Sequence, residues 1–292
     1  MDEYRVPLIA SAADMHVVPE HYAPYLYGTV FIAMFAGCLV YYRALTRLGT
    51  GGGRVRIDLF GIADMPVVAT ILIVLGLSAV SAWMVEGPKA AAEAAKFKSE
   101  HILPGALQYT IFPLGIVFFF YARNVSAIEV FGLRKVPVLR ALGYALGFLI
   151  ALLPLFFLTT DLTARCLGGD TELQPLVELY REGVRKQDHR VIWHTFLAAA
   201  VIAPISEEVL FRGYLYPALK RLIGALPSAV ISAVLFAAIH NNAVSLPGLT
   251  LLALALTIAF EWSGSLMVPV FIHSLFNSLS LVIAALTAHQ PV

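Results

Sequence analysis

Charged side chains are scarce in this sequence of 292 residues. Only 13% of the residues are Asp, Glu, Lys or Arg, whereas 59% are hydrophobic, and the mean hydropathy is +0.80. A soluble domain carries roughly 25% charged residues. The 20 Lys and Arg nearly balance the 19 Asp and Glu, so the chain has no strongly basic surface for nucleic acid. The composition therefore excludes a soluble protein and a nucleic-acid-binding protein, and it indicates an integral membrane protein with lipid as its solvent.

Cysteine is nearly absent as well. Cys38 and Cys166 are far apart and form no Cys-x-x-Cys pair, which excludes a thiolate zinc site or a dithiol redox site. We expect both to be small apolar fillers. The sequence also lacks the His-Glu-x-x-His motif of many zinc proteases. Its N-terminus, MDEYRVP, lacks the basic region and apolar core of a cleavable signal peptide, so the first span is expected to direct insertion.

Long apolar segments, by contrast, are abundant. A helix that crosses a membrane needs about 20 mostly apolar residues. Eight segments approach this length, at about 22–42, 65–85, 104–122, 141–160, 191–211, 227–242, 247–262 and 267–287. The predicted fold is an all-α, polytopic transmembrane bundle of about eight helices. The last four segments are short or interrupted by polar residues, which are tolerated only against protein or a water-filled cavity, so we expect the functional site there.

The Lys and Arg residues predict the orientation in the membrane. They follow the first, third and fifth segments, at Arg43, Arg47, Arg54, Arg56, Arg123, Arg134, Lys135, Arg140, Lys220 and Arg221. Short loops rich in Lys and Arg stay in the cytoplasm. The acidic N-terminus and the segment 86–103 are therefore predicted to lie outside, as are both termini. The segment 170–190 mixes charged and apolar residues at helical spacing, which is typical either of a helix at the membrane interface or of a solvated helix, and the sequence favours neither.

The most informative motif lies in the fifth segment. Glu207 and Glu208 stand side by side in an apolar stretch, and Arg212 follows four residues after Glu208. Positions four apart share a helix face, so Glu208 and Arg212 are predicted to pair and to neutralise each other. Glu207 points about 100° away from this pair and needs another partner. We therefore interpret Glu207 as the free carboxylate.

Two later helices offer partners for Glu207. Phe236 and His240 lie four residues apart in the sixth segment, and His273 and Asn277 lie four apart in the eighth. Glu207 and His240 are about equally far from the turn near residues 223–226, so an antiparallel helix pair brings them to a similar depth. The second pair lies somewhat shallower, within side-chain reach. The sequence thus predicts that four polar groups converge.

Such a cluster has the groups needed for peptide-bond hydrolysis. A carboxylate and an imidazole can deprotonate water or share a metal ion that acidifies it, and a second imidazole and an amide can stabilise an oxyanion. The motifs Glu207-Glu208-x-x-x-Arg212, Phe236-x-x-x-His240 and His273-x-x-x-Asn277 resemble those of the CAAX prenyl protease 2 and bacteriocin-processing (ABI/CPBP) family. The resemblance covers about residues 130–285. It leaves the first three spans, residues 1–125, outside a protease-like domain at 126–292.

The resemblance implies an intramembrane endopeptidase. Glu207 and His240 would activate water, while His273 and Asn277 would bind a metal or the oxyanion; Glu208, Arg212 and Phe236 would support them. Family members are classed as metalloproteases, and a metal-free glutamate mechanism is also argued. Glu207, His240 and His273 would suit Zn²⁺ as ligands, so both mechanisms stay open.

The implied substrate is a peptide or a prenylated or membrane-anchored protein, and the implied location is the bacterial cytoplasmic membrane. Two other classes of function remain. Buried Glu, His and Arg also form proton relays in carriers, although the sequence has no internal repeat. A membrane scaffold or immunity-type protein could keep the same fold without cleaving anything.

Overall fold

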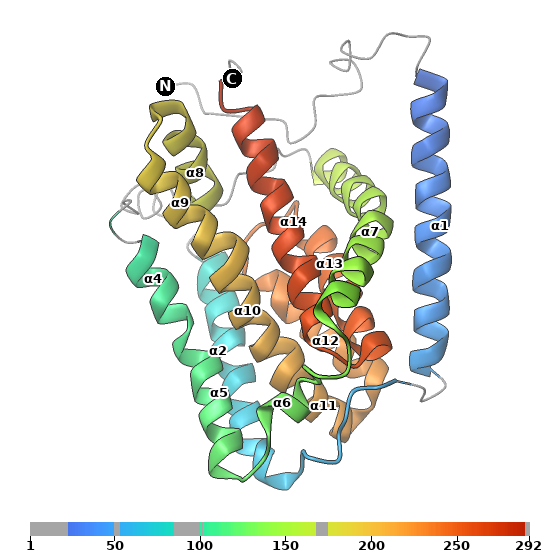
Figure 1. Cartoon of the computed structure of the whole chain (residues 1–292), viewed down its shortest axis with the longest axis vertical. Coiled ribbons are helices and arrows are strands. Elements are labelled where there is room, and N and C mark those ends of the chain that lie inside the picture. Colours follow the sequence, from blue (N-terminus) through green and yellow to red (C-terminus); the bar gives the residue numbers. More distant parts are fainter. Residues whose placement is uncertain (1–22, 50–52, 85–99, 101, 168–174, 290–292) are drawn as a thin grey trace.

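The computed structural model describes residues 23–49, 53–84, 100, 102–167 and 175–289. This part of the chain contains helices and turns and no strand, which confirms the predicted all-α bundle (Figure 1). The α-helices are α1 (Ala23–Gly49), α2 (Met65–Met84), α4 (Ile102–Tyr109), α5 (Ile111–Ala122), α6 (Ala127–Val130), α7 (Val138–Leu167), α8 (Pro175–Lys186), α9 (His189–Leu197), α10 (Ala203–Glu208), α11 (Tyr216–Ile223), α12 (Ala225–Ala238), α13 (Leu246–Ser263) and α14 (Met267–Leu286).

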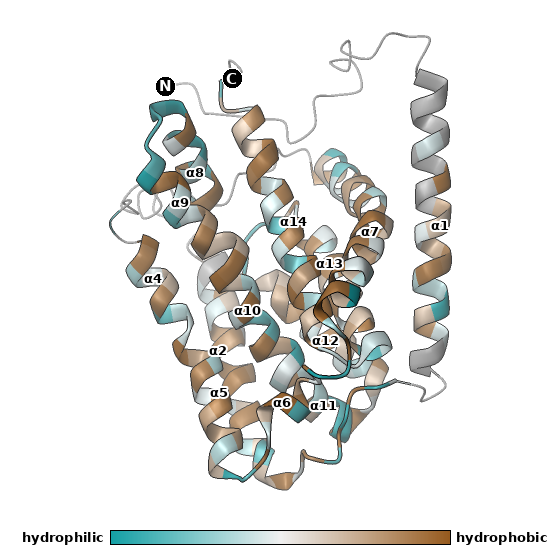
Figure 2. Ribbon diagram, viewed as in Figure 1, coloured by the Kyte–Doolittle hydropathy of each residue, from teal (hydrophilic) through white to brown (hydrophobic). Residues whose placement is uncertain are grey.

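Six helices in the described ranges are long and apolar enough to cross a membrane. They span Ile62–Ser81, Ile102–Ala122, Val138–Leu167, His189–Ile223, Leu246–Ser263 and Met267–Leu286. The first predicted segment forms α1, and the sixth forms α12, a shorter apolar helix of 14 residues. Figure 2 shows hydrophobic residues along the shafts of these helices and hydrophilic ones toward their ends. All eight predicted segments are thus helical, while the number of true membrane crossings stays a prediction.

The fifth span is one helix of 35 residues with two π-helical segments. These are η4 (Ala198–Ile202) and η5 (Val209–Leu215), and they flank α10, which carries both glutamates. Each π segment ends two residues before a proline, Pro204 or Pro217. Proline has no N–H for the carbonyl four residues earlier, and a local π adjustment can satisfy that carbonyl. The two prolines therefore explain why the helix widens on both sides of the glutamates.

The basic loops meet at one end of the bundle. The loop before α2 joins α13, because Arg54 N–H donates to Glu261 O at 2.9 Å. The loop before α7 contacts the loop before α2, because Lys135 Nζ donates to Arg54 O at 3.3 Å. It also contacts the end of α13, where Gly132 lies against Gly264. At Gly132, with φ of +60°, an added Cβ would lie 1.9 Å from Gly264 O, so only glycine fits. Helix α8 and the C-terminal end of α14 lie at the opposite end (Figure 1).

This separation gives the predicted orientation a direct test. We expect the end that carries the Lys- and Arg-rich loops to face the cytoplasm. Alkaline phosphatase fused after Arg56 should then be inactive, whereas a cytoplasmic reporter at the same point should be active. A fusion after Leu167, at the other end of α7, serves as the control and should give the reverse result. Phosphatase activity after Arg56 would contradict the orientation.

The N-terminal helices pack against the C-terminal ones rather than standing apart. The side chains of Phe60 and Phe120 are buried against Tyr214 of η5, with ring centroids 5.8 and 5.7 Å from the Tyr214 ring. Asp64 is fully buried, accepts from Arg123 Nη1 at 2.5 Å and accepts from the Tyr214 hydroxyl at 3.1 Å. These contacts link the first spans to the helix that carries the glutamates. The proposed boundary at 125/126 therefore separates parts of one packed bundle.

Both cysteines and most of the predicted helix at 170–190 lie within the described residues. Cys38 and Cys166, expected as fillers, are both exposed, because they lie on outward faces of α1 and α7. Within the described residues 175–190, the predicted helix is present as α8, while its location at a membrane interface stays a prediction. The acidic N-terminus and nearly all of segment 86–103 lie outside the described residues.

Candidate active site

The ion pair predicted between Glu208 and Arg212 is present and fully buried. Arg212 Nη1 donates to Glu208 Oε1 at 2.8 Å, and both side chains have 0% exposure. The same guanidinium donates from Nη2 to Ala253 O at 2.8 Å. A buried charge is tolerated only when paired and hydrogen-bonded. Helix α13 thus supplies an anchor for Arg212 that the motif alone does not reveal.

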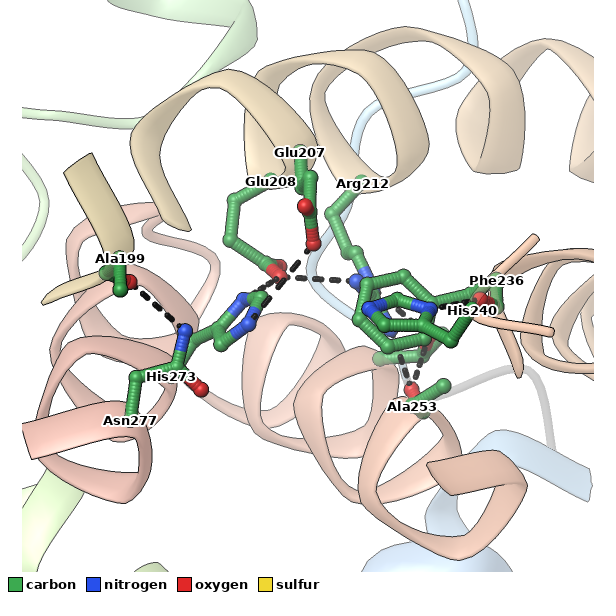
Figure 3. A network of polar contacts seen from close by, with 10 residues as sticks. Ala199, Glu207, Glu208, Arg212, Phe236, His240, Ala253, His273 and Asn277 are labelled. Carbon is green, nitrogen blue, oxygen red and sulfur yellow. Dashed lines mark hydrogen bonds and ion pairs between the residues drawn. The ribbon is translucent and has the colours of Figure 1, made fainter. Parts of the chain in front are cut away.

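His273 of α14 lies between the two glutamates (Figure 3). Its Nδ1 is 3.0 Å from Glu208 Oε1, and its Nε2 is 3.8 Å from Glu207 Oε2. Because a carboxylate only accepts, the Nδ1 atom carries the proton of this hydrogen bond. Glu208 therefore fixes the tautomer and the orientation of the ring, so that Nε2 faces Glu207.

Glu207 is the carboxylate outside the ion pair, and its Oε2 atom, like Oε2 of Glu208, has no hydrogen-bond partner among the described residues. The side chain of Glu207 is 10% exposed, and its Oε2 atom is buried. A buried polar atom without a partner costs free energy and points to a role for water, a ligand or catalysis. The sequence prediction that Glu207 remains outside the Glu208–Arg212 pair agrees with this geometry.

Phe236 of α12 packs against several polar groups of the site. Its ring centroid is 4.9 Å from Arg212 Cζ and 4.8 and 5.6 Å from the rings of His240 and His273. The cation–π contact helps to offset the buried guanidinium charge. The His240 Nδ1 atom lies 2.7 Å from Phe236 O, and because a carbonyl only accepts, this nitrogen carries the proton. The Nε2 atom of neutral His240 therefore keeps a free lone pair.

Asn277 binds the backbone of the first π segment. Its Nδ2 donates to Ala199 O at 2.8 Å. The carbonyl lies in η4, where the regular helical pattern is broken. The amide keeps a second N–H and its Oδ1 for other partners. Asn277 therefore connects α14 to the helix that carries Glu207.

A cavity of about 850 Å³ contains Glu207, His240, His273 and Asn277 in its lining. This volume is within the usual range for ligand-binding pockets. Its walls come from α4, α5, α7, α8, the long helix at 189–223, and α12 to α14. The four groups that the sequence predicts to converge thus share one cavity. Figure 3 shows how Glu207, Glu208, Arg212, His240, His273 and Asn277 lie relative to one another.

Sequence reasoning missed the wall that the N-terminal spans contribute. Gln108 and Tyr109 of α4 line the cavity with the motif residues, and Tyr109 interacts electrostatically with Glu207. A polar pair inside an apolar span was the available signal, because such residues face protein or a cavity. Glu261 of α13 lies at the basic end of the bundle and is not among the residues that line the cavity. It binds the Tyr216 hydroxyl at 2.6 Å and the Lys220 ammonium.

The metal-ligand set Glu207, His240 and His273 stays a prediction. Within the described ranges, no group of three His, Cys, Asp or Glu side chains is arranged to hold a metal ion. His273 uses Nδ1 for Glu208, and its Nε2 is 3.8 Å from Glu207 Oε2. The three side chains line one cavity but, as they stand, do not fit a ligand set.

The fold and the site define a polytopic helical membrane protein in which a carboxylate, Glu207, and two imidazoles, His240 and His273, line one cavity. Residues 189–279 match the family described as type II CAAX prenyl endopeptidase, Rce1-like. This match supports the family resemblance that the motifs indicate. The match covers a shorter segment than the 130–285 predicted from the resemblance. It includes all seven motif residues from Glu207 to Asn277.

One relative is the membrane-embedded CAAX protease MroQ of Staphylococcus aureus (strain USA300). It is 31% identical over 84 residues, which cover 27% of this chain and 34% of that protein. The alignment thus spans about a third of the relative's length. No solved structure matches the chain significantly.

Proposed function

We propose that this chain is an intramembrane endopeptidase of the CAAX-processing type, located in the bacterial cytoplasmic membrane. The observation that carries the proposal is the position of Glu207. Its Oε2 atom has no hydrogen-bond partner among the described residues, and the side chain lines the cavity and faces His273 Nε2. A general base must be free to accept a proton and must be close to the site where water and substrate meet. The family match at 189–279 supports the same assignment.

In the proposed reaction, Glu207 and the Nε2 lone pair of His240 orient a water molecule, and Glu207 takes its proton. The resulting hydroxide attacks the carbonyl carbon of the scissile peptide bond. The mechanism requires His273 to carry a proton on Nε2 as well as on Nδ1 before the reaction and to keep both throughout, so that its Nε2 and the second N–H of Asn277 Nδ2 donate hydrogen bonds to the oxyanion. When the C–N bond breaks, Glu207 returns the proton to the leaving amine. Glu208 acts through His273 by holding Nδ1, so we class it as a positioning residue.

The direct test is a cleavage assay with purified protein in detergent. The probe is a peptide with an S-farnesyl cysteine near its C-terminus, and the unmodified peptide is a second probe. We expect a single cleavage product, identified by mass spectrometry. Failure to cleave either probe, in detergent and in vesicles, would contradict the proposed activity and favour a carrier or scaffold.

Removal of metal distinguishes the two mechanisms. The protein is incubated with a chelator, dialysed and assayed before and after addition of Zn²⁺. If Glu207 acts as the base without a metal, the rate should be unchanged within about twofold, because the carboxylate alone then takes the proton from water. Loss of activity and its recovery with Zn²⁺ would assign the metal mechanism.

A further inference from the structure

One face of α14 lines the cavity from its inner to its outer end. The lining residues His273, Asn277, Ser280, Ala284 and Thr287 follow one another at intervals of four and three, which is the spacing of a single helix face. His273 is only 3% exposed, whereas Thr287 is partly exposed. The cavity therefore extends along α14 from the buried His273 to the end that α8 contacts, while Asn277 and His240 are partly exposed as well.

The length of this face sets the depth of the cavity. From His273 to Thr287 the helix rises by about 21 Å. An extended peptide covers this distance with roughly six residues. A folded domain is too wide for a cavity of about 850 Å³. A substrate that enters at the outer end can thus reach Glu207 only with an extended segment.

The outer end is held in place by α8. Arg181 Nη2 donates to Thr287 O and Arg185 Nε donates to Ala288 O, both at 2.9 Å. These bonds satisfy carbonyls at the C-terminal end of α14, which have no partner within the helix. Leu176 of the same helix lines the cavity. The two hydrogen bonds hold α8 against the C-terminal end of α14, at the outer end of the cavity.

The walls between the rim and the catalytic groups are uncharged. Among the described lining residues, Glu207 is the one Asp, Glu, Lys or Arg. Most of the others are apolar, such as Phe156 and Phe157 of α7 and Phe112 of α5. A charged side chain placed along these walls would lose its hydration without gaining a partner. The cavity thus favours an uncharged segment.

From these observations we propose that the cavity measures the distance between the scissile bond and the folded body of the substrate. The substrate class is a protein with a flexible, uncharged tail, and at least about six residues must separate the scissile bond from any folded part. This inference rests on the proposed endopeptidase function and specifies its substrate. On the predicted orientation the rim lies at the non-cytoplasmic end, so the reporter fusions described above also decide from which side the tail enters.

A series of substrates tests the proposed distance. A small, rigid soluble domain is joined to the S-farnesyl-cysteine tail through uncharged spacers, so that about two, six or ten residues precede the scissile bond. We expect equal kcat/KM for the two longer substrates and a fall of about tenfold or more for the shortest. Replacing one central residue of the longest spacer by Lys should also lower kcat/KM by about tenfold.

Two variants on α14 test whether the tail follows this path. Ser280→Trp places a large side chain on the cavity face between His273 and Thr287, and should slow all substrates by about tenfold or more. Val282→Trp is the matched control, because Val282 is 52% exposed on the outer side of the same helix. It should cleave at the parent rate. Gel filtration in detergent shows whether both variants are folded.

The outcomes separate the two proposals. Cleavage of all three spacer lengths at equal rates would overturn the distance rule alone, and would indicate entry from the side, past the exposed Tyr109 and Phe112. Equal activity of Ser280→Trp and the parent protein would overturn the path. If even the longest substrate is not cleaved, the endopeptidase function fails and the distance rule fails with it.

Discussion

Turnover of the S-farnesyl peptide is expected to fall by about 100-fold or more when Glu207 is replaced by Gln, because the amide cannot accept the proton of water. The substitution keeps the size of the side chain. Since Glu207 Oε2 has no hydrogen-bond partner among the described residues, no observed bond to that atom is lost and the fold should survive. KM should change little, because the apolar walls are unaltered. The measurement is kcat and KM of the purified variant, with its unfolding temperature as a check.

A matched control is Glu182→Gln on α8, where the carboxylate is exposed and pairs with Lys186. It should cleave at the parent rate. His240→Ala should be about as inactive as Glu207→Gln, and the double variant scarcely slower than either, because groups that act as a unit are not additive. If both single variants cleaved at the parent rate, the protease site would be abandoned in favour of a carrier or scaffold.

Loss of Arg212 should mainly affect folding. In Arg212→Ala, the carboxylate of Glu208 stays buried without its partner, and Ala253 O loses a donor. Breaking one partner of a buried pair costs about 3–5 kcal/mol. We expect a marked loss of folded protein from the membrane and a lower unfolding temperature in detergent. Normal yield and stability with a selective loss of turnover would place Arg212 among the catalytic groups instead.

The chain offers a matched control for this ion pair. Arg165 and Asp161 of α7 form the same arrangement four residues apart at 2.9 Å, but the two side chains are 67% and 37% exposed. Arg165→Ala should therefore cost only about 0.3–0.5 kcal/mol. A second variant removes both buried charges, Glu208→Leu with Arg212→Met. It should recover much of the lost stability, because no unpaired charge remains, although His273 then loses its Nδ1 partner.

The helices and their order could be predicted from the sequence because the membrane restricts the choice of structure. Backbone polar groups in lipid must be satisfied within a helix or a closed barrel, so apolar segments of the right length are sufficient to locate helices. The pairing of Glu208 with Arg212 could also be predicted, because positions four apart on one helix lie on the same face. The prediction that Glu207 and His240 lie at a similar depth required only the lengths of two antiparallel helices.

The partners of each site group depended on tertiary packing. That Glu208 holds His273, that Asn277 binds Ala199 O, and that α4 closes one wall all arise between helices far apart in the sequence. Local periodicity does not contain the rotation of one helix about its axis relative to another, and the two π segments of the long helix shift that rotation further. The sequence by itself thus determined the membrane setting, the helices and the candidate groups. Only the packed bundle decided which atoms of these groups face one another and how deep in the cavity they lie.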